Sequence, residues 1–450
     1  MSIYTSQIKT HIIDPVYDRA NSRAEYRLDK GIYLTSLRLL GLGAVSTGDT
    51  SNYSDIVGAL GVIKQISLYD DNQLLDQLLE SSIWLSFKSF NTKNQDNMSL
   101  KQNLVHNMMG NQFSGYNIGA TQVGQKVQVF DVRRGVIDVN QPNATTNATT
   151  SGYLSLKDVF PLLKNLTALN TETVFKNLKI VVEYHSDSEF YVNDTQRIPY
   201  STIEAQLVAD EVVGDMGKQK FSKFEGVSYS SIEHDRVNVP AVLPTDTVPV
   251  VNQSQTLHVN GFNNKTLGRM LIVKTPTDAR NYKAYDATTS VVGTAMLHYG
   301  KTASKAFNKE VLQIRVNGSS LIAGRGITGD NQRLGMLSDV WGKTTLIPFG
   351  NGMSHDIPDG SQRAVYLNDG SLSMSELDYY GININKKVED LQIDFSRECL
   401  YSFVSSPTVK AEDDAATVYS NDNQAIQMNV FCEVYKQIQP TANGYNVVYL

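Results

Sequence analysis

Cysteine and tryptophan are the residues that this chain uses least, with two of each among 450 residues. Cys399 and Cys432 are too few for a disulfide scaffold, so we expect both to be reduced and buried. Long apolar runs are also missing, because none approaches the roughly 20 residues that span a bilayer. Residues 1–23 lack an apolar core and a cleavage pattern, so we expect no secretion signal.

Blocks of basic residues are absent as well. The formal net charge is −6, with 40 Lys and Arg against 46 Asp and Glu spread along the chain. Such a distribution argues against direct contact with nucleic acid, which needs clustered cations. The length exceeds one ordinary core, so two domains are expected.

Spacings that mark metal or catalytic sites are also missing. No two of the histidines have HxH or HxxxH spacing; they are His11, His106, His185, His234, His258, His298 and His355. His234 lies between Glu233 and Asp235, but a salt-bridged start of a strand explains this group better than a catalytic triad. The glycine-rich stretch 324–330 lacks the Lys-Ser/Thr that grips phosphate, so we expect a loop there.

The remaining polar motifs also have structural explanations. Residues 186–195 are acidic but lack calcium-loop spacing, and Asp70-Asp71 is a turn rather than an acid–base pair. The Leu-rich stretch 156–166 lacks the basic face of a membrane helix, so burial against a sheet is expected. We therefore expect no catalytic, cofactor or metal residues and no enzyme activity.

Short runs of alternating Val, Ile, Tyr and Phe dominate the chain and predict strands with one buried face. They occupy residues 31–43, 62–70, 82–90, 126–139, 178–184, 205–213, 268–275, 310–318, 381–385, 390–396 and 427–438. Many short strands with few helices predict sandwiches or barrels.

Helical patterns are few. One covers residues 151–169, with Ser155 as a cap and an interruption at Pro161, and a second, shorter one lies at 329–342. Long polar stretches at 91–125, 140–152, 276–305 and 405–426 are expected to be loops with a function, given their length.

One short sequence motif occurs twice in the chain. Residues 65–78 (QISLYDDNQLLDQL) and 313–324 (QIRVNGSSLIAG) both place an aliphatic strand before a polar turn and an aliphatic pair, at an offset of about 248. Asn317-Gly318 is a strong hairpin signal. The run after Leu178 also has a counterpart at 388–395, so we predict a duplicated domain. We expect Ile66 and Ile314 to occupy equivalent strand positions.

Four segments, in this order, resemble the double jelly-roll major capsid proteins of DNA viruses, as in polinton-like viruses, virophages and large algal viruses. They are an early strand pair at 54–78, a Leu/Pro-rich helix leading into a strand at 154–184, the start of a second roll at 231–242, and a matching hairpin at 309–321. The resemblance implies an all-β fold of two tandem eight-stranded antiparallel jelly rolls with one or two short helices in loops. The expected domains are an N-terminal arm (1–30), a first jelly roll (31–213), a connector (214–225), and a second jelly roll with a C-terminal tail (226–450).

The same resemblance implies a function. Such a protein forms pseudo-hexameric homotrimeric capsomers that tile an icosahedral shell, so the chain is expected in the virion. Its implied partners are itself, neighbouring trimers, and penton and minor capsid or cement proteins; internal membrane contact is left open. The arm is expected to act in shell assembly, so that trimers survive deletion of residues 2–24.

Two alternatives share the fold class. One is a carbohydrate-binding β-sandwich protein, although Trp84 and Trp341 lie in apolar contexts rather than in a surface cluster. The other is a viral assembly scaffold protein of the same fold, which leaves the mature particle. The sequence does not separate this scaffold from a shell protein.

Overall fold

The computed structural model of the chain divides into two compact units. The first unit holds Met1–Glu233, Lys283–Ala287 and Glu433–Leu450, and the second holds His234–Tyr282 and Thr288–Cys432. The structure describes residues 7–19, 22–40, 51–53, 63–81, 83–85, 153–185, 191–193, 196–197, 205–214, 218, 221, 224, 226–242, 248, 250–276, 284–286, 310–328, 330–341, 379–400, 425–441 and 444–450. The predicted strand at 126–139 and the predicted loops at 91–125 and 140–152 lie outside these residues, as do most of 276–305 and 405–426.

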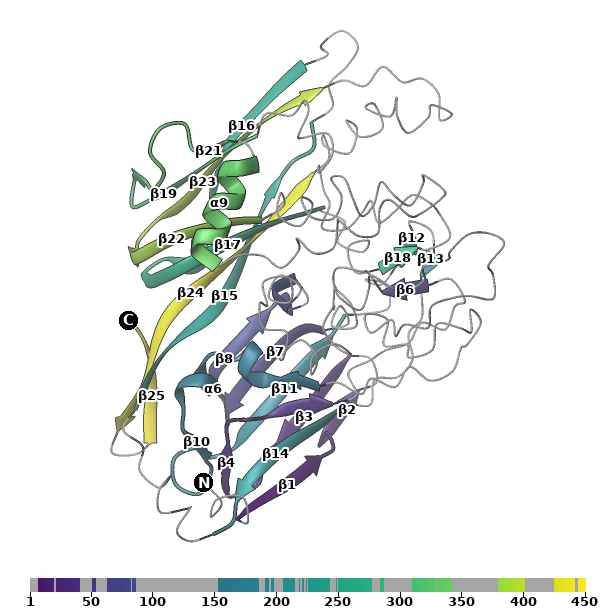
Figure 1. Cartoon of the computed structure of the whole chain (residues 1–450), viewed down its shortest axis with the longest axis vertical. Helices are drawn as coiled ribbons and strands as arrows, with labels where there is room; N and C mark the ends of the chain where they lie inside the picture. The colour runs from purple at the N-terminus through teal and green to yellow at the C-terminus, as the bar shows by residue number, and fades with distance from the viewer. Residues whose placement is uncertain are drawn as a thin grey trace. The chain divides into compact units, whose positions relative to one another are not determined.

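Two antiparallel sheets form the first unit (Figure 1). One has the order β10 (Ala168–Asn170), β4 (Ile32–Leu34), β14 (Gln206–Val212), β5 (Arg38–Leu40) and β9 (Tyr153–Ser155), with β1 (Ile8–Ile13) also paired to β14. The other has the order β2 (Tyr17–Arg19), β3 (Arg23–Arg27), β11 (Leu178–Tyr184), β7 (Ile63–Asp70) and β8 (Gln73–Leu79). Ile66 and Leu68 on β7 are fully buried, as are Leu207 and Ala209 on β14. This spacing of two is the strand period, which aims alternate side chains into one core.

The segment predicted as an N-terminal arm contains strands. β1 pairs along its length with β14, from Ile8 opposite Val212 to Ile13 opposite Leu207, and β3 pairs with β11. Tyr26 on β3 is completely buried and donates its hydroxyl to the Ala205 carbonyl at 2.7 Å. The prediction that residues 1–30 lack strand structure is therefore wrong. β1 shows no clear alternation in sequence because it pairs on one side only among the described strands and is largely exposed. The domain boundaries at 31, 214 and 226 stay predictions.

The Leu-rich stretch of the first unit forms two short helices rather than one. α5 (Leu156–Val159) and α6 (Leu162–Asn165) are separated at Pro161, where the predicted interruption occurs. Six apolar side chains of this stretch are buried, namely Leu156, Val159, Phe160, Leu162, Leu163 and Leu166. Burial of this stretch, predicted from its missing basic face, is confirmed.

The predicted strand at 82–90 is wrong where the structure describes it. The backbone is helical at Ser81 and at 83–85, and the amides of Ile83 and Trp84 donate to the Glu80 carbonyl at 3.0 and 3.3 Å. Ile83, Trp84 and Leu85 are all buried in succession. Three consecutive buried residues do not follow the alternation of a half-buried strand, so the period was misassigned.

The second unit is also built on antiparallel sheets (Figure 1). One sheet has the order β15 (Val227–Val239), β24 (Ile426–Thr441), β17 (Lys265–Pro276) and β22 (Tyr379–Val388), and β25 (Gly444–Tyr449) pairs with β24. The other has the order β16 (Val250–His258), β23 (Leu391–Leu400), β19 (Val311–Val316) and β20 (Ser319–Ser320), and β21 (Ile327–Thr328) pairs with β19. The start of β15, the end of β24 and all of β25 belong to the first unit.

A helix covers the sheet of β17 and β22, as Figure 1 shows. It is α9 (Asp330–Trp341), which confirms the predicted second helix. Trp341 donates its indole N–H to the Met270 carbonyl at 3.2 Å. A side chain at Gly381 would come within 2.9 Å of the Leu337 Cα atom, so glycine permits the close contact of helix and sheet.

Smaller elements complete the description. β12 (Tyr191–Asn193) pairs with β13 (Gln196–Arg197), and β18 (Ala284–Asp286) pairs with β6 (Ser51–Tyr53). A 3-10 turn, η4 (Asn260–Phe262), precedes β17.

The duplicated hairpin is present in both units. The order β11-β7-β8 in the first unit corresponds to β23-β19-β20 in the second. Each turn begins with a residue in the left-handed backbone region, Asp71 and Asn317, both with φ of 53°. Their amides donate to the equivalent carbonyls of Asn177 and Asp390, at 2.9 Å in each case.

These turn contacts correct the register of the repeat. With Asp71 matched to Asn317, Ile314 corresponds to Leu68 and not to Ile66, because Ile314 pairs with Ile393 and Leu68 with Ile180. Ile66 and Ile314 lie on equivalent strands but two residues out of step. A slip of two residues leaves every side chain on the same face of the sheet, so the sequence pattern does not detect it.

Candidate functional site

The described residues contain no group of three or more His, Cys, Asp and Glu that could hold a metal ion. The motif at 233–235 is divided among separate partners. Glu233 pairs with the Lys436 ammonium at 2.7 Å, while His234 Nε2 lies 3.1 Å from the Asn429 side-chain oxygen. Asp235 accepts the amide of Gly261 at 2.8 Å. These contacts are those of a strand with salt bridges and hydrogen bonds, and they do not form a triad.

The other polar motifs take structural positions too. Asp71 lies in the β7–β8 turn, as predicted. In the glycine-rich stretch, Gly324 and Gly326 have positive φ, and a side chain at Gly326 would meet the Leu312 carbonyl at 2.7 Å. The backbone of residues 324–326 therefore requires these glycines, and the predicted loop is confirmed there. It is wrong at Ile327–Thr328, which form β21, and at Asp330, which begins α9.

Both tryptophans are packed within the protein. Trp84 is 3% exposed, and Trp341 stacks against the Arg269 guanidinium, 4.3 Å from the ring centroid. Neither forms the flat exposed platform that sugars stack on. No helix in the described part of the chain is both long and apolar enough to cross a membrane.

The two cysteines lie on the predicted strands of the second unit. Cys432 on β24 is buried and free, as predicted. Cys399 lies on β23, and its side chain is outside the described part. Whether the two thiols are neighbours stays a prediction.

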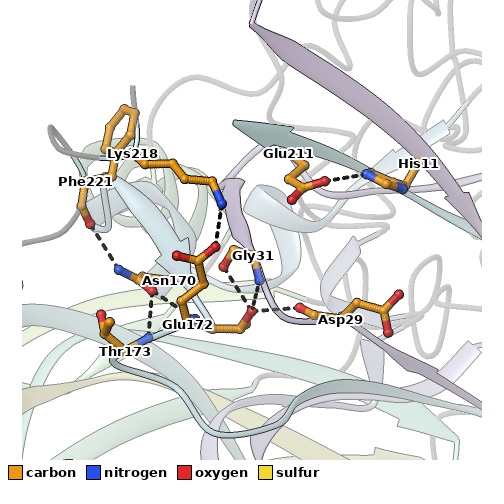
Figure 2. Close-up of polar contacts among 10 residues, drawn as sticks. His11, Asp29, Gly31, Asn170, Glu172, Thr173, Glu211, Lys218 and Phe221 are labelled. Atoms are coloured by element: carbon orange, nitrogen blue, oxygen red, sulfur yellow. Dashed lines mark hydrogen bonds and ion pairs between the residues drawn. The ribbon is translucent and has the colours of Figure 1, made fainter. Parts of the chain in front are cut away.

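One polar network within the first unit joins Lys218 and Phe221 to the end of β10 and the turn that follows it. Figure 2 shows Lys218 directed at Glu172, with Nζ and Oε1 2.5 Å apart, and Asn170 directed at Phe221. The Asn170 amide donates to the Phe221 carbonyl at 3.4 Å, while its oxygen accepts the amides of Glu172 and Thr173 at 3.0 Å each. Asn170 therefore ends β10, shapes the following turn and binds the backbone at Phe221.

A second part of this network fixes the segment before β4. The Thr171 hydroxyl donates to the Asp29 carbonyl at 2.7 Å and accepts the Gly31 amide at 2.8 Å. On the neighbouring strands, His11 Nε2 lies 2.8 Å from Glu211 Oε2, as drawn in Figure 2. Segments far apart in the sequence are thus joined by short polar contacts at one sheet.

The C-terminal hairpin of β24 and β25 contacts the end of β7 and the turn that follows β10. Tyr445 on β25 donates its hydroxyl to Asp70 Oδ2 at 2.7 Å, and its ring packs edge-on against Phe175 at 5.4 Å. Asp70 Oδ1 also accepts the amides of Lys176 and Asn177, at 2.8 and 2.7 Å. Burial, followed by the bond to Asp70, raises the pKa of Tyr445 above its ordinary value. Asp70 is therefore an anchor for the end of the described chain.

Beside this contact lies a group of polar side chains, here called the Asp76 cluster: the buried Asp76, Ser231 and Lys436, and the half-buried Glu233. Asp76 is 1% exposed and accepts the Ser231 hydroxyl at 2.6 Å. Burial raises the pKa of the Asp76 carboxyl to about 6, against the opposing effects of the Ser231 bond and the Lys436 charge. Burial alone would lower the pKa of Lys436, but the Glu233 carboxylate outweighs it, so the pKa of Lys436 is raised.

The sequence pattern did not single out this cluster. Asp76 lies within the run LLDQLL, where a charged residue occupies an otherwise apolar stretch, and that was the available signal. A buried carboxylate needs partners, but the partners come from β15 and β24, more than 150 residues away. Local patterns carry no information about such partners.

Exposed apolar side chains gather on the N-terminal strands. Ile12 is 63% exposed, Val16 57% and Tyr17 52%. β1 and β2 each pair on one side only among the described strands. Unpaired strand edges with exposed apolar residues are surfaces at which another chain can pack.

Two antiparallel sandwiches in tandem, each with the same hairpin order, define the double jelly-roll class, and the chain has this fold. In a comparison with solved structures, the chain is similar to VP54 of PBCV-1, fitted into a reconstruction of the virophage Sputnik (TM-score 0.59, 10% identity, 98% of this chain and 97% of that chain). It is also similar to the chain of a PBCV-1 virus capsid structure (TM-score 0.55, 10% identity, 98% and 96%) and to the mavirus major capsid protein (TM-score 0.51, 10% identity, 100% and 91%). No protein-family model matches the sequence, and no match is found among curated proteins.

Proposed function

We propose that this chain is the major capsid protein of a DNA virus. The observation that carries this proposal is the match of the double fold over 98% of this chain and 97% of a viral capsid protein chain. A partial match to one sandwich would suit many binding proteins, because one fold serves many functions. A match over both rolls leaves far fewer candidate functions than a match over one.

The assembly follows from the tandem rolls. Three chains in a ring present six similar rolls, a pseudo-hexagonal block that tiles a flat facet of an icosahedral shell. Cyclic closure repeats one heterologous contact between copies. The exposed apolar side chains of β1 and β2 support this proposal, because a subunit that buries surface against a second copy carries such side chains before assembly.

Further proposals follow from that assembly. The first roll ends at about residue 213 and the second begins at about residue 226, and the chain resides in the virion. Its partners are neighbouring trimers together with penton and minor capsid proteins. We assign it no enzymatic step.

The native mass tests the proposal. One chain has a mass of 49.9 kDa, so a homotrimer is expected at 3 × 49.9 = 149.7 kDa by light scattering at micromolar concentration. The trimer interface should exceed the roughly 1,200–2,000 Å² of a standard pairwise contact. Negative-stain images should show blocks with triangular or hexagonal outlines. A monomer in solution, together with no trimer in purified particles, would overturn the proposal.

A further inference from the structure

The C-terminal hairpin is held within the first unit by contacts whose role does not depend on the proposed function. Three chain segments meet at the β7–β8 hairpin: the start of β15, the end of β24, and β25. Together, residues 227–233 and 433–450 are here called the clasp, and all of them belong to the first unit. β24 pairs with β25 from Lys436 opposite Tyr449 to Thr441 opposite Gly444.

Four polar contacts fix the clasp to or within this unit. Tyr445 donates to Asp70 at 2.7 Å, and Tyr229 donates to the Leu75 carbonyl at 2.5 Å. The Ser231 hydroxyl donates to Asp76 at 2.6 Å. The Lys436–Glu233 pair, at 2.7 Å, lies within the clasp itself. Asp76 is thus the ionisable residue of β8 that the clasp covers.

The charges of the Asp76 cluster do not balance when every group is ionised. Glu233 and Asp76 then carry two negative charges against the single positive charge of Lys436. Lys436 is 8% exposed at its side chain and Asp76 is 1% exposed, so water screens the excess charge poorly. One proton on Asp76 makes the cluster neutral while the Glu233–Lys436 pair stays intact.

The polar groups around Asp76 come from several elements. From β15 come Tyr229, Ser231 and Glu233, and from β24 comes Lys436. From β25, Tyr449 faces Lys436, with the ammonium 4.9 Å from the ring centroid. The chain around Asp76 supplies two amides, those of Leu162 at 3.3 Å and Gln77 at 3.0 Å, both donated to its carboxylate oxygens. Among these groups Lys436 is the cation that acts on Asp76.

We propose that the clasp is a proton-controlled device, in which uptake of one proton by Asp76 tightens the hold of residues 227–233 and 433–450 on the β7–β8 hairpin. When the clasp opens, Asp76 meets water and regains an ordinary carboxyl pKa near 3.8. The closed state then binds the proton more tightly than the open state. Closing is therefore favoured as the pH falls from about 6 toward 3.8, and opening is favoured as the pH rises through the same range. Above about 6 the carboxyl is ionised in both states, so the opening constant levels off.

Hydrogen–deuterium exchange of the full chain tests this device. Peptides covering 436–449 are compared at pH 5.2 and pH 7.2, after correction for the pH dependence of intrinsic exchange. With the closed pKa at about 6 and the open one at 3.8, the opening constant should be on the order of five- to tenfold larger at the higher pH. Peptides covering β11 serve as the internal reference and should not change by this factor.

Variants identify the group responsible. Asp76→Asn imitates the protonated carboxyl, so its clasp should open equally at both pH values. Glu172→Gln removes an exposed carboxylate of the same unit and should leave the pH response unchanged. If Asp76→Asn does not fold, Ser231→Ala provides the second test. It removes a bond that favours the ionised form, so the transition should move to higher pH.

The proposal is overturned by either of two results. One is exchange over 436–449 that does not differ between the two pH values in the natural protein. The other is a pH response that survives Asp76→Asn or does not move in Ser231→Ala. None of these readouts involves the oligomeric state, so the clasp and the capsid assignment are tested separately.

Discussion

At the scale of single residues, the two units bury ionisable groups in pairs. Lys274 in the second unit is 1% exposed at its side chain, and its ammonium lies 2.7 Å from Glu310 Oε2. The Tyr380 hydroxyl donates to the same carboxylate oxygen at 3.3 Å. A buried pair of this kind contributes little net stability when complete, but removal of one member leaves the other charge without compensation.

We therefore expect Glu310→Gln to destabilise the protein by about 3–5 kcal/mol, because it removes the carboxylate that neutralises buried Lys274. Urea denaturation followed by tryptophan fluorescence measures the change. The matched control is Glu172→Gln, which disrupts an ion pair whose side chains are 32% and 36% exposed. Its cost should stay below about 1 kcal/mol. Equal costs for the two variants would contradict the role of burial.

At the scale of elements, the N-terminal strands belong to the sheets of the first unit. β1 covers one side of β14 along six residue pairs, and β3 contributes the completely buried Tyr26. These contacts alter the expectation for the deletion of residues 2–24. The sequence alone predicts that trimers survive this deletion, whereas the pairing of β1 and β3 predicts that the subunit does not fold well.

We expect deletion of residues 2–24 to abolish most soluble protein, because it removes β1, β2 and the first two residues of β3 and exposes the hydrogen-bonding edge of β14. Deletion of residues 2–6 removes only chain before β1 and serves as the control, with normal solubility expected. The soluble fraction and the native mass of both variants provide the measurement. A soluble trimer of normal stability from the longer deletion would show that these strands are dispensable.

At the scale of the whole molecule, a shell protein and an assembly scaffold of the same fold differ in whether the chain is present in the mature particle. Both would form the same rolls and could form the same trimer, so the fold does not separate them. The difference lies in the mature particle, where a shell subunit must be present in many copies.

We expect this chain to be the most abundant protein in purified mature particles, because the shell repeats its capsomer over every facet. Quantitative mass spectrometry of particles, before and after maturation, measures this abundance. The abundance of the chain in immature particles is the control, because a scaffold protein and a shell protein are both present there. Loss of the chain on maturation would favour the scaffold function.

Prediction from the sequence succeeded to different degrees at different positions. The strands at 178–184 and 205–213 were predicted within one residue of β11 and β14, because their alternation and burial agree. The stretch 31–43 instead forms two short strands, β4 and β5. For the Asp76 cluster the local pattern held only a charged residue in an apolar run, without its partners.

By itself, the sequence determined the local features: the strand periods, the helix interruption at Pro161, and the turn at Asn317-Gly318, where φ is positive at both residues. Each depends on the conformations open to a few neighbouring residues. The tertiary structure alone decided that Ile8 pairs with Val212 and that Tyr445 bonds to Asp70, 375 residues away. It also decided that Asp76 is buried, which raises the pKa of its carboxyl to about 6. Such contacts depend on which distant surfaces the fold brings together, and no local pattern of side chains encodes that choice.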